Sequence, residues 1–151
     1  MDNKTVVLLD LNATLAVEYG LDTKNWTYDV TRDKYSQKLV DAMQAEGYEV
    51  HIVTARPEVY EADTLAKIEE DTGLVPFATC FKDKKNKFTA IHDLKSLYLD
   101  RLVQQGYDID EIMALESNAK TRANYKKAGL DTVYTRAQFL ARYAKKEKQK
   151  R

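Results

Sequence analysis

Residues 5–15, TVVLLDLNATL, decide the fold of this 151-residue chain, because a nearly unbroken apolar run ends there in a polar turn. Two later runs, HIVT at 51–54 and IMAL at 112–115, have the same character. Continuous apolar runs of this length suit parallel strands that are covered on both faces. Because they alternate with helical segments of roughly 10–15 residues, they indicate βαβ units and an α/β protein.

The glycines define the order of the elements. Four of the five follow a segment with apolar residues at helical spacing and precede a predicted strand, as glycine does when it closes a helix. We expect a three-layer, Rossmann-like parallel sheet of about five strands with helices on both faces. The predicted strands lie near residues 5–11, 48–54, 76–81, 111–115 and 132–134. The predicted helices lie near residues 33–46, 58–72, 89–105, 119–128 and 136–148.

Composition limits the classes of protein to consider. Lysine plus arginine number 24, as do aspartate plus glutamate, and the absence of net charge argues against a generally basic nucleic-acid-binding protein. One cysteine cannot form an internal disulfide, which fits a cytoplasmic setting. No apolar stretch approaches the roughly 20 residues of a membrane span, so no membrane partner is expected. We expect one domain over 1–144 with a basic, disordered tail at 145–151, and the sequence does not indicate an oligomeric state.

Polar side chains follow three of the predicted strands at the end where parallel sheets bind ligands. Asp10, Thr54 and Glu116 come directly after the three apolar runs. A carboxylate at such a place can be a nucleophile or a ligand of a hard metal ion, and a hydroxyl can hold a phosphoryl oxygen. Lys95, on the helix after the third strand, could neutralise a phosphate.

Four motifs in this order resemble those of the haloacid dehalogenase-like (HAD) superfamily. VVLLDLNATL resembles its first motif, D-x-D-x-T after an apolar strand, and HIVTAR resembles its second. TARP is similar to the T-G-R-P of polynucleotide 3′-phosphatase-type members. HDLKSLYLDRL fits the region of the third motif, and LESNAKTRANYKKAGLDTVY resembles the fourth, a D-D pair followed by a helix and K-x-x-G-[LI]-D. The resemblance extends from about Thr5 to Tyr134.

The resemblance implies hydrolysis of a phosphomonoester through an aspartyl-phosphate on Asp10, with Mg²⁺ bridging Asp10 and the phosphate. The implied catalytic residues are Asp10, Asn12, Thr54 and Lys95. The implied substrate-binding residues are Thr14, Arg56 and Trp26. The implied metal ligands are Asp10, the backbone carbonyl of Asn12, Glu116 and Ser117.

Two departures from the family pattern bear on activity. Position 12 is asparagine where the family has aspartate, and an amide cannot transfer the proton that is typically worth about 10²–10⁴-fold in rate. Glu116-Ser117 stands in place of the Asp-Asp pair, which removes one carboxylate from the metal site. His92 on the helix of Lys95 could serve as a substitute acid or be a surface residue.

These departures leave alternatives open. The chain could be a slow Mg²⁺-dependent phosphatase or a pseudo-phosphatase that serves as a binding module. A metal-free, dehalogenase-like hydrolase ranks last, because the chain has no room for a cap domain that would enclose a dry apolar pocket. About 40 residues separate Thr14 from Thr54, and a similar number separates Thr54 from Lys95, so neither gap holds a large cap.

An uncapped site is open to macromolecular ends, so the expected substrate is a nucleotide or a nucleic-acid terminal phosphate. Residues 16–31 would be a small flap, and its Tyr19, Trp26 and Tyr28 either stack on bases or pack against the body. The lysines of 82–87 and the basic residues of 142–151 either contact nucleic-acid phosphates or are simply solvated.

Overall fold

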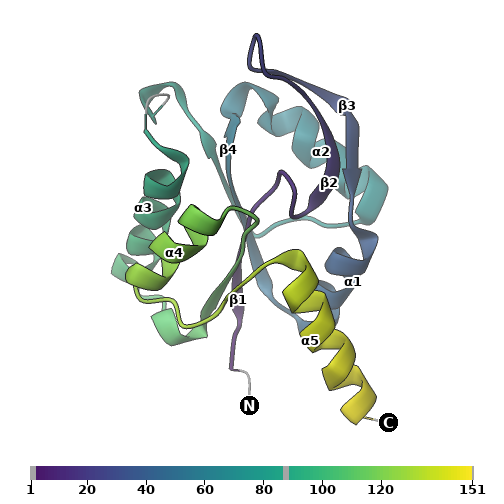
Figure 1. Ribbon diagram of the computed structural model, residues 1–151, viewed down its shortest axis with the longest axis vertical. Helices are drawn as coiled ribbons and strands as arrows, with labels where there is room; N and C mark the ends of the chain where they lie inside the picture. Colours follow the sequence, from purple (N-terminus) through teal and green to yellow (C-terminus); the bar gives the residue numbers. More distant parts are fainter. Residues whose placement is uncertain (1–2, 87–88, 151) are drawn as a thin grey trace.

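Five parallel strands form the central sheet in the order β5–β4–β1–β6–β7 (Figure 1). Their bounds are Val6–Leu9 (β1), Glu49–Pro57 (β4), Ala78–Lys82 (β5), Ile112–Leu115 (β6) and Val133–Tyr134 (β7). The computed structural model describes residues 3–86 and 89–150. The predicted parallel α/β sheet is confirmed. Because β4 lies on one side of β1 and β6 on the other, the sheet reverses its winding direction at β1, where such sheets bind ligands.

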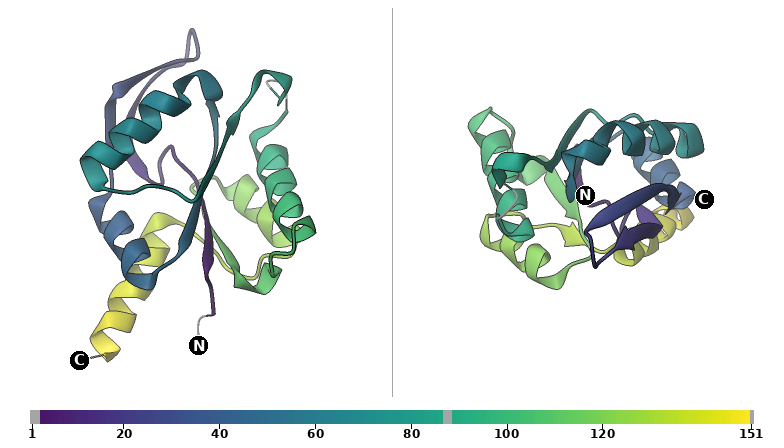
Figure 2. Two further views of the ribbon diagram at one scale, coloured as in Figure 1. Left: turned by 180° about the vertical axis from the view of Figure 1, so that it is seen from behind. Right: turned by 90° about the horizontal axis from the view of Figure 1, so that it is seen from above.

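Helices cover both faces of the sheet, which confirms the predicted three layers (Figures 1 and 2). Their bounds are Gln37–Glu46 (α1), Glu61–Thr72 (α2), Ile91–Gln104 (α3), Ala119–Lys127 (α4) and Arg136–Gln149 (α5). Side chains of β1 alternate between the faces. Val7 and Leu9 pack in the core formed with α1, α2 and α5, whereas Val6 and Leu8 pack in the core formed with α3 and α4. The continuous apolar run of β1 is therefore explained by burial on both sides.

A two-stranded antiparallel hairpin, β2 (Ala16–Asp22) and β3 (Thr27–Tyr35), occupies the segment predicted as a flap. The predicted flap ended at residue 31 and a helix was expected from 33, and both boundaries are wrong. Strand β3 continues past residue 31, with Asp33 buried in it. Helix α1 starts only after Ser36, whose hydroxyl accepts a hydrogen bond from the backbone N–H of Leu39 at 3.2 Å.

The C-terminal helix was predicted near 136–148, and α5 ends at Gln149. It therefore includes residues 145–149 of the segment that was expected to be a disordered tail. A capping box between Thr135 and Gln138 starts this helix, and Lys146 forms an ion pair with Glu46 at 2.9 Å. Residues 87–88 of the lysine-rich loop and Arg151 lie outside the described residues. Within the described part of the chain, no helix is long and apolar enough to cross a membrane.

Candidate active site

The carboxylate of Asp10 lies directly after β1 and is held by three donors. Its Oδ1 accepts a hydrogen bond from Lys95 Nζ at 2.7 Å. Its Oδ2 accepts hydrogen bonds from Thr14 Oγ1 at 2.9 Å and Ser117 Oγ at 3.0 Å. The intervening Ala13 has a positive φ of 64°, which turns the chain so that Thr14 comes back toward Asp10. The side chain is only 6% exposed, so these donors and not bulk water stabilise its charge.

Lys95 links the carboxylates of Asp10 and Glu116. Its Nζ lies 2.5 Å from Glu116 Oε1, and the lysine is fully buried on α3. Burial disfavours the ammonium, but the two neighbouring carboxylates outweigh it and raise the pKa of Lys95. Burial, followed by the charge of Asp10, raises the pKa of Glu116 to about 7, although Lys95 acts in the opposite direction. One ammonium therefore does not neutralise both carboxylates, and the cluster can take up a proton or a cation.

The loop between β6 and α4 completes this cluster. Ser117 Oγ also lies 3.3 Å from the backbone carbonyl oxygen of Asn12. The loop is fixed by the start of α4, because Asn118 accepts a hydrogen bond from the Thr121 N–H at 3.0 Å and its own N–H donates to Glu116 Oε2 at 3.1 Å. Among the described residues, no group of three or more histidine, cysteine, aspartate or glutamate side chains could hold a metal ion. Any cation here would use two carboxylates together with neutral oxygen atoms.

The side-chain amide of Asn12 has partners at both ends. Its Oδ1 accepts a hydrogen bond from Arg56 Nη2 at 2.9 Å, and its Nδ2 donates to Tyr28 Oη at 2.9 Å. The guanidinium of Arg56 is 4.5 Å from the centre of the Tyr28 ring. Asn12 therefore connects the loop after β1 to the hairpin and to β4.

The guanidinium of Arg56 lies inside a buried network and not at an open surface. It forms two hydrogen bonds with Asp33, at 2.6 and 3.1 Å, and both side chains are fully buried. Thr64 Oγ1 accepts a further hydrogen bond from Nη1 at 3.1 Å. Asp33 was missed in the sequence, because no periodicity in its segment distinguishes it from the acidic residues around it. Tyr28 was considered only as a residue for base stacking or packing.

Like Arg56, the predicted residues Thr54, Trp26 and His92 lie outside the contacts of Asp10. Thr54 is buried at the end of β4, and its Oγ1 accepts a hydrogen bond from the backbone N–H of Arg56 at 3.0 Å. Trp26 is 67% exposed at the turn of the hairpin. His92 Nε2 lies 3.6 Å from Asp93 Oδ1. The structure thus gathers Asp10, Asn12, Thr14, Lys95, Glu116 and Ser117 into one cluster.

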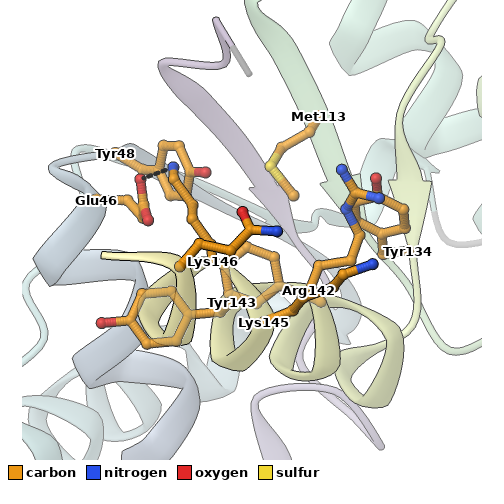
Figure 3. A pocket seen from close by; sticks show the side chains of 10 residues that line it. Glu46, Tyr48, Met113, Tyr134, Arg142, Tyr143, Lys145 and Lys146 are labelled. Atoms are coloured by element: carbon orange, nitrogen blue, oxygen red, sulfur yellow. Dashed lines mark hydrogen bonds and ion pairs between the residues drawn. The ribbon is translucent and has the colours of Figure 1, made fainter. Parts of the chain in front are cut away.

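A hollow of about 380 Å³ lies elsewhere, between α5 and strands β6 and β7 (Figure 3). Its walls combine aromatic and basic side chains, among them Tyr48, Tyr134 and Arg142. No residue of the Asp10 cluster lines it. Buried charges at the ends of parallel strands identify the site better than this hollow does, because they carry the reactive groups.

Comparison with known proteins supports the fold. No protein-family model and no curated protein significantly matches the sequence. Among solved structures, a chain in the structure of the Pnkp1/Rnl/Hen1 RNA repair complex aligns with a TM-score of 0.62 and 13% identity, over 87% of this chain and 42% of that one. This protein therefore spans less than half of that chain.

Two further structures match at similar identity. A putative HAD superfamily (subfamily III A) hydrolase from Legionella pneumophila has a TM-score of 0.53 and 14% identity, over 89% of this chain and 66% of that one. A third match is the 3-deoxy-D-manno-octulosonate 8-phosphate phosphatase from Moraxella catarrhalis, solved in complex with magnesium, phosphate and KDO. Its TM-score is 0.56 and its identity 12%, over 89% of this chain and 77% of that one. These likenesses, together with the parallel sheet and its order of strands, show that the chain has the α/β fold of the haloacid dehalogenase-like superfamily.

Proposed function

We propose that this chain is a slow, Mg²⁺-dependent phosphohydrolase in which Asp10 is the nucleophile and the substrate is a nucleotide or a nucleic-acid terminal phosphate. The observation that carries the proposal is the contact of 2.7 Å between the buried Asp10 carboxylate and the ammonium of Lys95. A carboxylate held in this way at the end of the central strand is placed to attack an incoming phosphorus atom.

The residues around Asp10 would act through charge and position. An oxygen of Asp10 forms the bond to phosphorus while the bond to the leaving oxygen breaks. The ammonium of Lys95 offsets the negative charge that the phosphoryl group brings to a buried site. The hydroxyl groups of Thr14 and Ser117 orient the attacking carboxylate. The Thr54 hydroxyl at the end of the neighbouring strand would hold a phosphoryl oxygen.

The oxygen atoms near Asp10 suit Mg²⁺. Ser117 Oγ lies 3.0 Å from Asp10 Oδ2 and 3.3 Å from the Asn12 carbonyl oxygen. Neighbouring ligands in an octahedral Mg²⁺ shell, with bonds of about 2.1 Å, lie about 3 Å apart. Asp10, the Asn12 carbonyl and Ser117 would therefore hold the ion, with Glu116 as the second carboxylate. When bound, Mg²⁺ would neutralise the phosphate and polarise its oxygen atoms.

The position of the lysine-rich segment supports a polyanionic substrate. Lys82 ends β5, and Lys84 and Lys85 follow it at the same edge of the sheet as Asp10, since all five strands are parallel. Lysines beside an open site attract phosphate chains. Two structures of similar fold concern RNA repair and a sugar-phosphate phosphatase, which is consistent with phosphate chemistry at this site.

A pseudo-phosphatase that binds phosphate without hydrolysing it is the second candidate. The observation in its favour is the amide of Asn12, which forms hydrogen bonds with Arg56 and Tyr28 and cannot act as a general acid or base. Such a protein would retain the positive charge of Lys95 and the hydroxyl groups near Asp10. It would bind a phosphate mimic and release no product.

Phosphate release from a broad panel, which includes phosphorylated oligonucleotides, tests the proposal in the presence of Mg²⁺ or Mn²⁺. We expect slow release by the wild type and none by Asp10→Ala. Asn12→Asp should raise the rate, because a carboxylate beside Arg56 is ionised at neutral pH and can accept a proton from the attacking water. If the wild type and Asn12→Asp are equally silent, the enzyme proposal is wrong. Binding of a phosphate mimic by these silent proteins would then favour the second candidate.

A further inference from the structure

The donors that contact Asp10 are used to hold its charge. Thr14 and Ser117 donate their hydroxyl protons to Asp10 Oδ2, and Lys95 donates to Asp10 and Glu116. Aliphatic hydroxyl groups are very weak acids, and an ammonium shared by two carboxylates keeps its proton. Efficient proton donation requires a group whose pKa is close to the working pH. None of these three residues therefore suits the protonation of a departing oxygen.

Glu116 and Asn12 are the next side chains, and both are committed to other contacts. Glu116 Oε1 accepts a hydrogen bond from Lys95, and its Oε2 accepts one from the Asn118 N–H. Glu116 is also only 1% exposed, so it does not reach a substrate directly. The amide of Asn12 has no acidic proton, and Arg56 and Tyr28 fix both of its ends.

His92 Nε2 lies 3.6 Å from Asp93 Oδ1 and outside the contacts of Asp10. Among the side chains that contact the cluster, Tyr28 is the remaining candidate donor, because its hydroxyl group touches the Asn12 amide. The Tyr28 oxygen accepts the hydrogen bond from Asn12 Nδ2 at 2.9 Å, and the Arg56 guanidinium lies 4.5 Å from the centre of its ring. A phenol has an ordinary pKa of about 10 and therefore transfers its proton poorly at neutral pH. The described residues around the nucleophile thus stabilise negative charge but do not include an effective acid.

We infer that the site is selective for phosphoryl groups whose leaving group is stable as an anion, namely acyl phosphates, phosphoanhydrides and aryl phosphates, over alkyl phosphomonoesters. This inference rests on the proposed function and narrows its substrate: among nucleotides it favours anhydride bonds over the phosphate ends of nucleic acids. An Asp10 oxygen bonds to phosphorus, and the leaving oxygen departs with the electron pair of the broken bond and without a proton from the chain. Water then attacks phosphorus, which frees phosphate, restores the carboxylate and releases a proton to the solvent.

The expected selectivity has a definite size. General acid help is worth about 10²–10⁴-fold for leaving groups that need it and little for those that do not. We therefore expect kcat/KM to fall by about 10²–10⁴-fold between activated aryl phosphates and alkyl phosphates. The second step also lacks a base, so the aspartyl-phosphate should accumulate and give a burst of leaving group before the steady state.

The test is a leaving-group series with Mg²⁺ present: dinitrophenyl, nitrophenyl and phenyl phosphate, acetyl phosphate, pyrophosphate, glycerol phosphate and a phosphorylated oligonucleotide. The measured quantity is kcat/KM, which reports the steps up to departure of the leaving group. A steep decline with rising pKa of the leaving group is expected, and equal values for aryl and alkyl substrates would overturn the inference. Asp10→Ala separates the two proposals: if no substrate shows release that depends on Asp10, the proposed function fails and this inference with it.

Tyr28→Phe gives an independent check on the missing acid. We expect the dependence of kcat/KM on the pKa of the leaving group to have the same slope as in the wild type, since the phenol does not protonate the leaving group. The matched control is Tyr60→Phe, because Tyr60 packs edge-on against Tyr28, with ring centres 5.4 Å apart, and has no contact with Asn12 among the described hydrogen bonds. A steeper slope in Tyr28→Phe alone would show that Tyr28 donates the proton and would overturn the inference.

Discussion

Lys95 is the residue on which the charge balance of the site depends. Its ammonium is fully buried between two carboxylates, at 2.7 Å from Asp10 and 2.5 Å from Glu116. Removing three charged groups from water is costly, and the attraction between them offsets this cost only while all three are present. The same lysine therefore links the loop after β1 to the loop after β6.

Replacing this lysine should destabilise the protein strongly. Lys95→Met keeps the length of the side chain but leaves Asp10 and Glu116 as buried carboxylates without a counter-ion. We expect a loss of about 3–5 kcal/mol in the free energy of unfolding, measured by urea denaturation at a pH above that at which Glu116 ionises. Adding Glu116→Gln to Lys95→Met should recover part of the loss. A single variant as stable as the wild type would contradict the described cluster.

At the scale of elements, one guanidinium joins the hairpin to the body of the protein. Arg56 comes from β4 and contacts Asp33 on β3, Thr64 on α2 and Asn12 after β1. Because the pair between Arg56 and Asp33 is fully buried, the hairpin is held against the sheet by a contact that water does not weaken. This network therefore sets the position of the hairpin relative to Asp10.

The loss of that contact should loosen the hairpin first. Asp33→Asn leaves the guanidinium buried without its counter-charge, a change that typically costs about 3–5 kcal/mol. Relative to the wild type, we expect amide hydrogen exchange, measured by mass spectrometry, to accelerate more in residues 16–35 than in the central sheet. Asp29→Asn is the matched control, since Asp29 lies in the same strand and is exposed. Equal exchange in the two variants would show that the pair with Arg56 does not hold the hairpin.

The packing of α3 on β4 should make the fold sensitive to alkaline pH. The hydroxyl oxygen of Tyr98 on α3 lies 2.6 Å from His51 Nδ1 on β4. Burial raises the pKa of this tyrosine from about 10 to about 12. A raised pKa in the folded state means that this stabilisation is complete below pH 10 and is lost as the pH rises through 12. We expect the free energy of unfolding to fall in that window, and to fall less steeply in Tyr98→Phe. Identical slopes would contradict the role of Tyr98.

The sequence predicted the parallel sheet well, because a strand buried on both faces leaves a continuous apolar run. It did not predict the hairpin, whose β2 exposes most of its residues and whose pairing has irregular register. Without a buried face, no alternation of apolar residues marks a strand. The proximity of Asp10 and Glu116 was predicted because both follow parallel strands, whose carboxyl ends lie at the same edge of the sheet. The pairing of Arg56 with Asp33, 23 residues apart, has no local signature and needed the structure.

At the scale of the whole molecule, the site lies where the two halves of the sheet meet. Asp10 follows the central strand and Lys95 comes from α3 on one face of the sheet. The hairpin, whose Tyr28 contacts Asn12, packs against α2 on the opposite face (Figure 2). Both cores must therefore be formed before the cluster exists. A ligand that bridges the loops after β1 and β6 would stabilise the molecule as one unit.

Mg²⁺ should therefore raise the thermal stability of the entire protein. A ligand that binds only the folded state at about one hundred times its Kd adds about 2.7 kcal/mol. In a domain of this size each kcal/mol raises Tm by about 2–4 °C, so we expect an increase of about 5–10 °C by calorimetry. Asp10→Asn should lose the increase, because it removes a carboxylate that would hold the ion. If Mg²⁺ raised Tm equally in both proteins, the stabilisation would come from general ionic effects and the metal site would not be at Asp10.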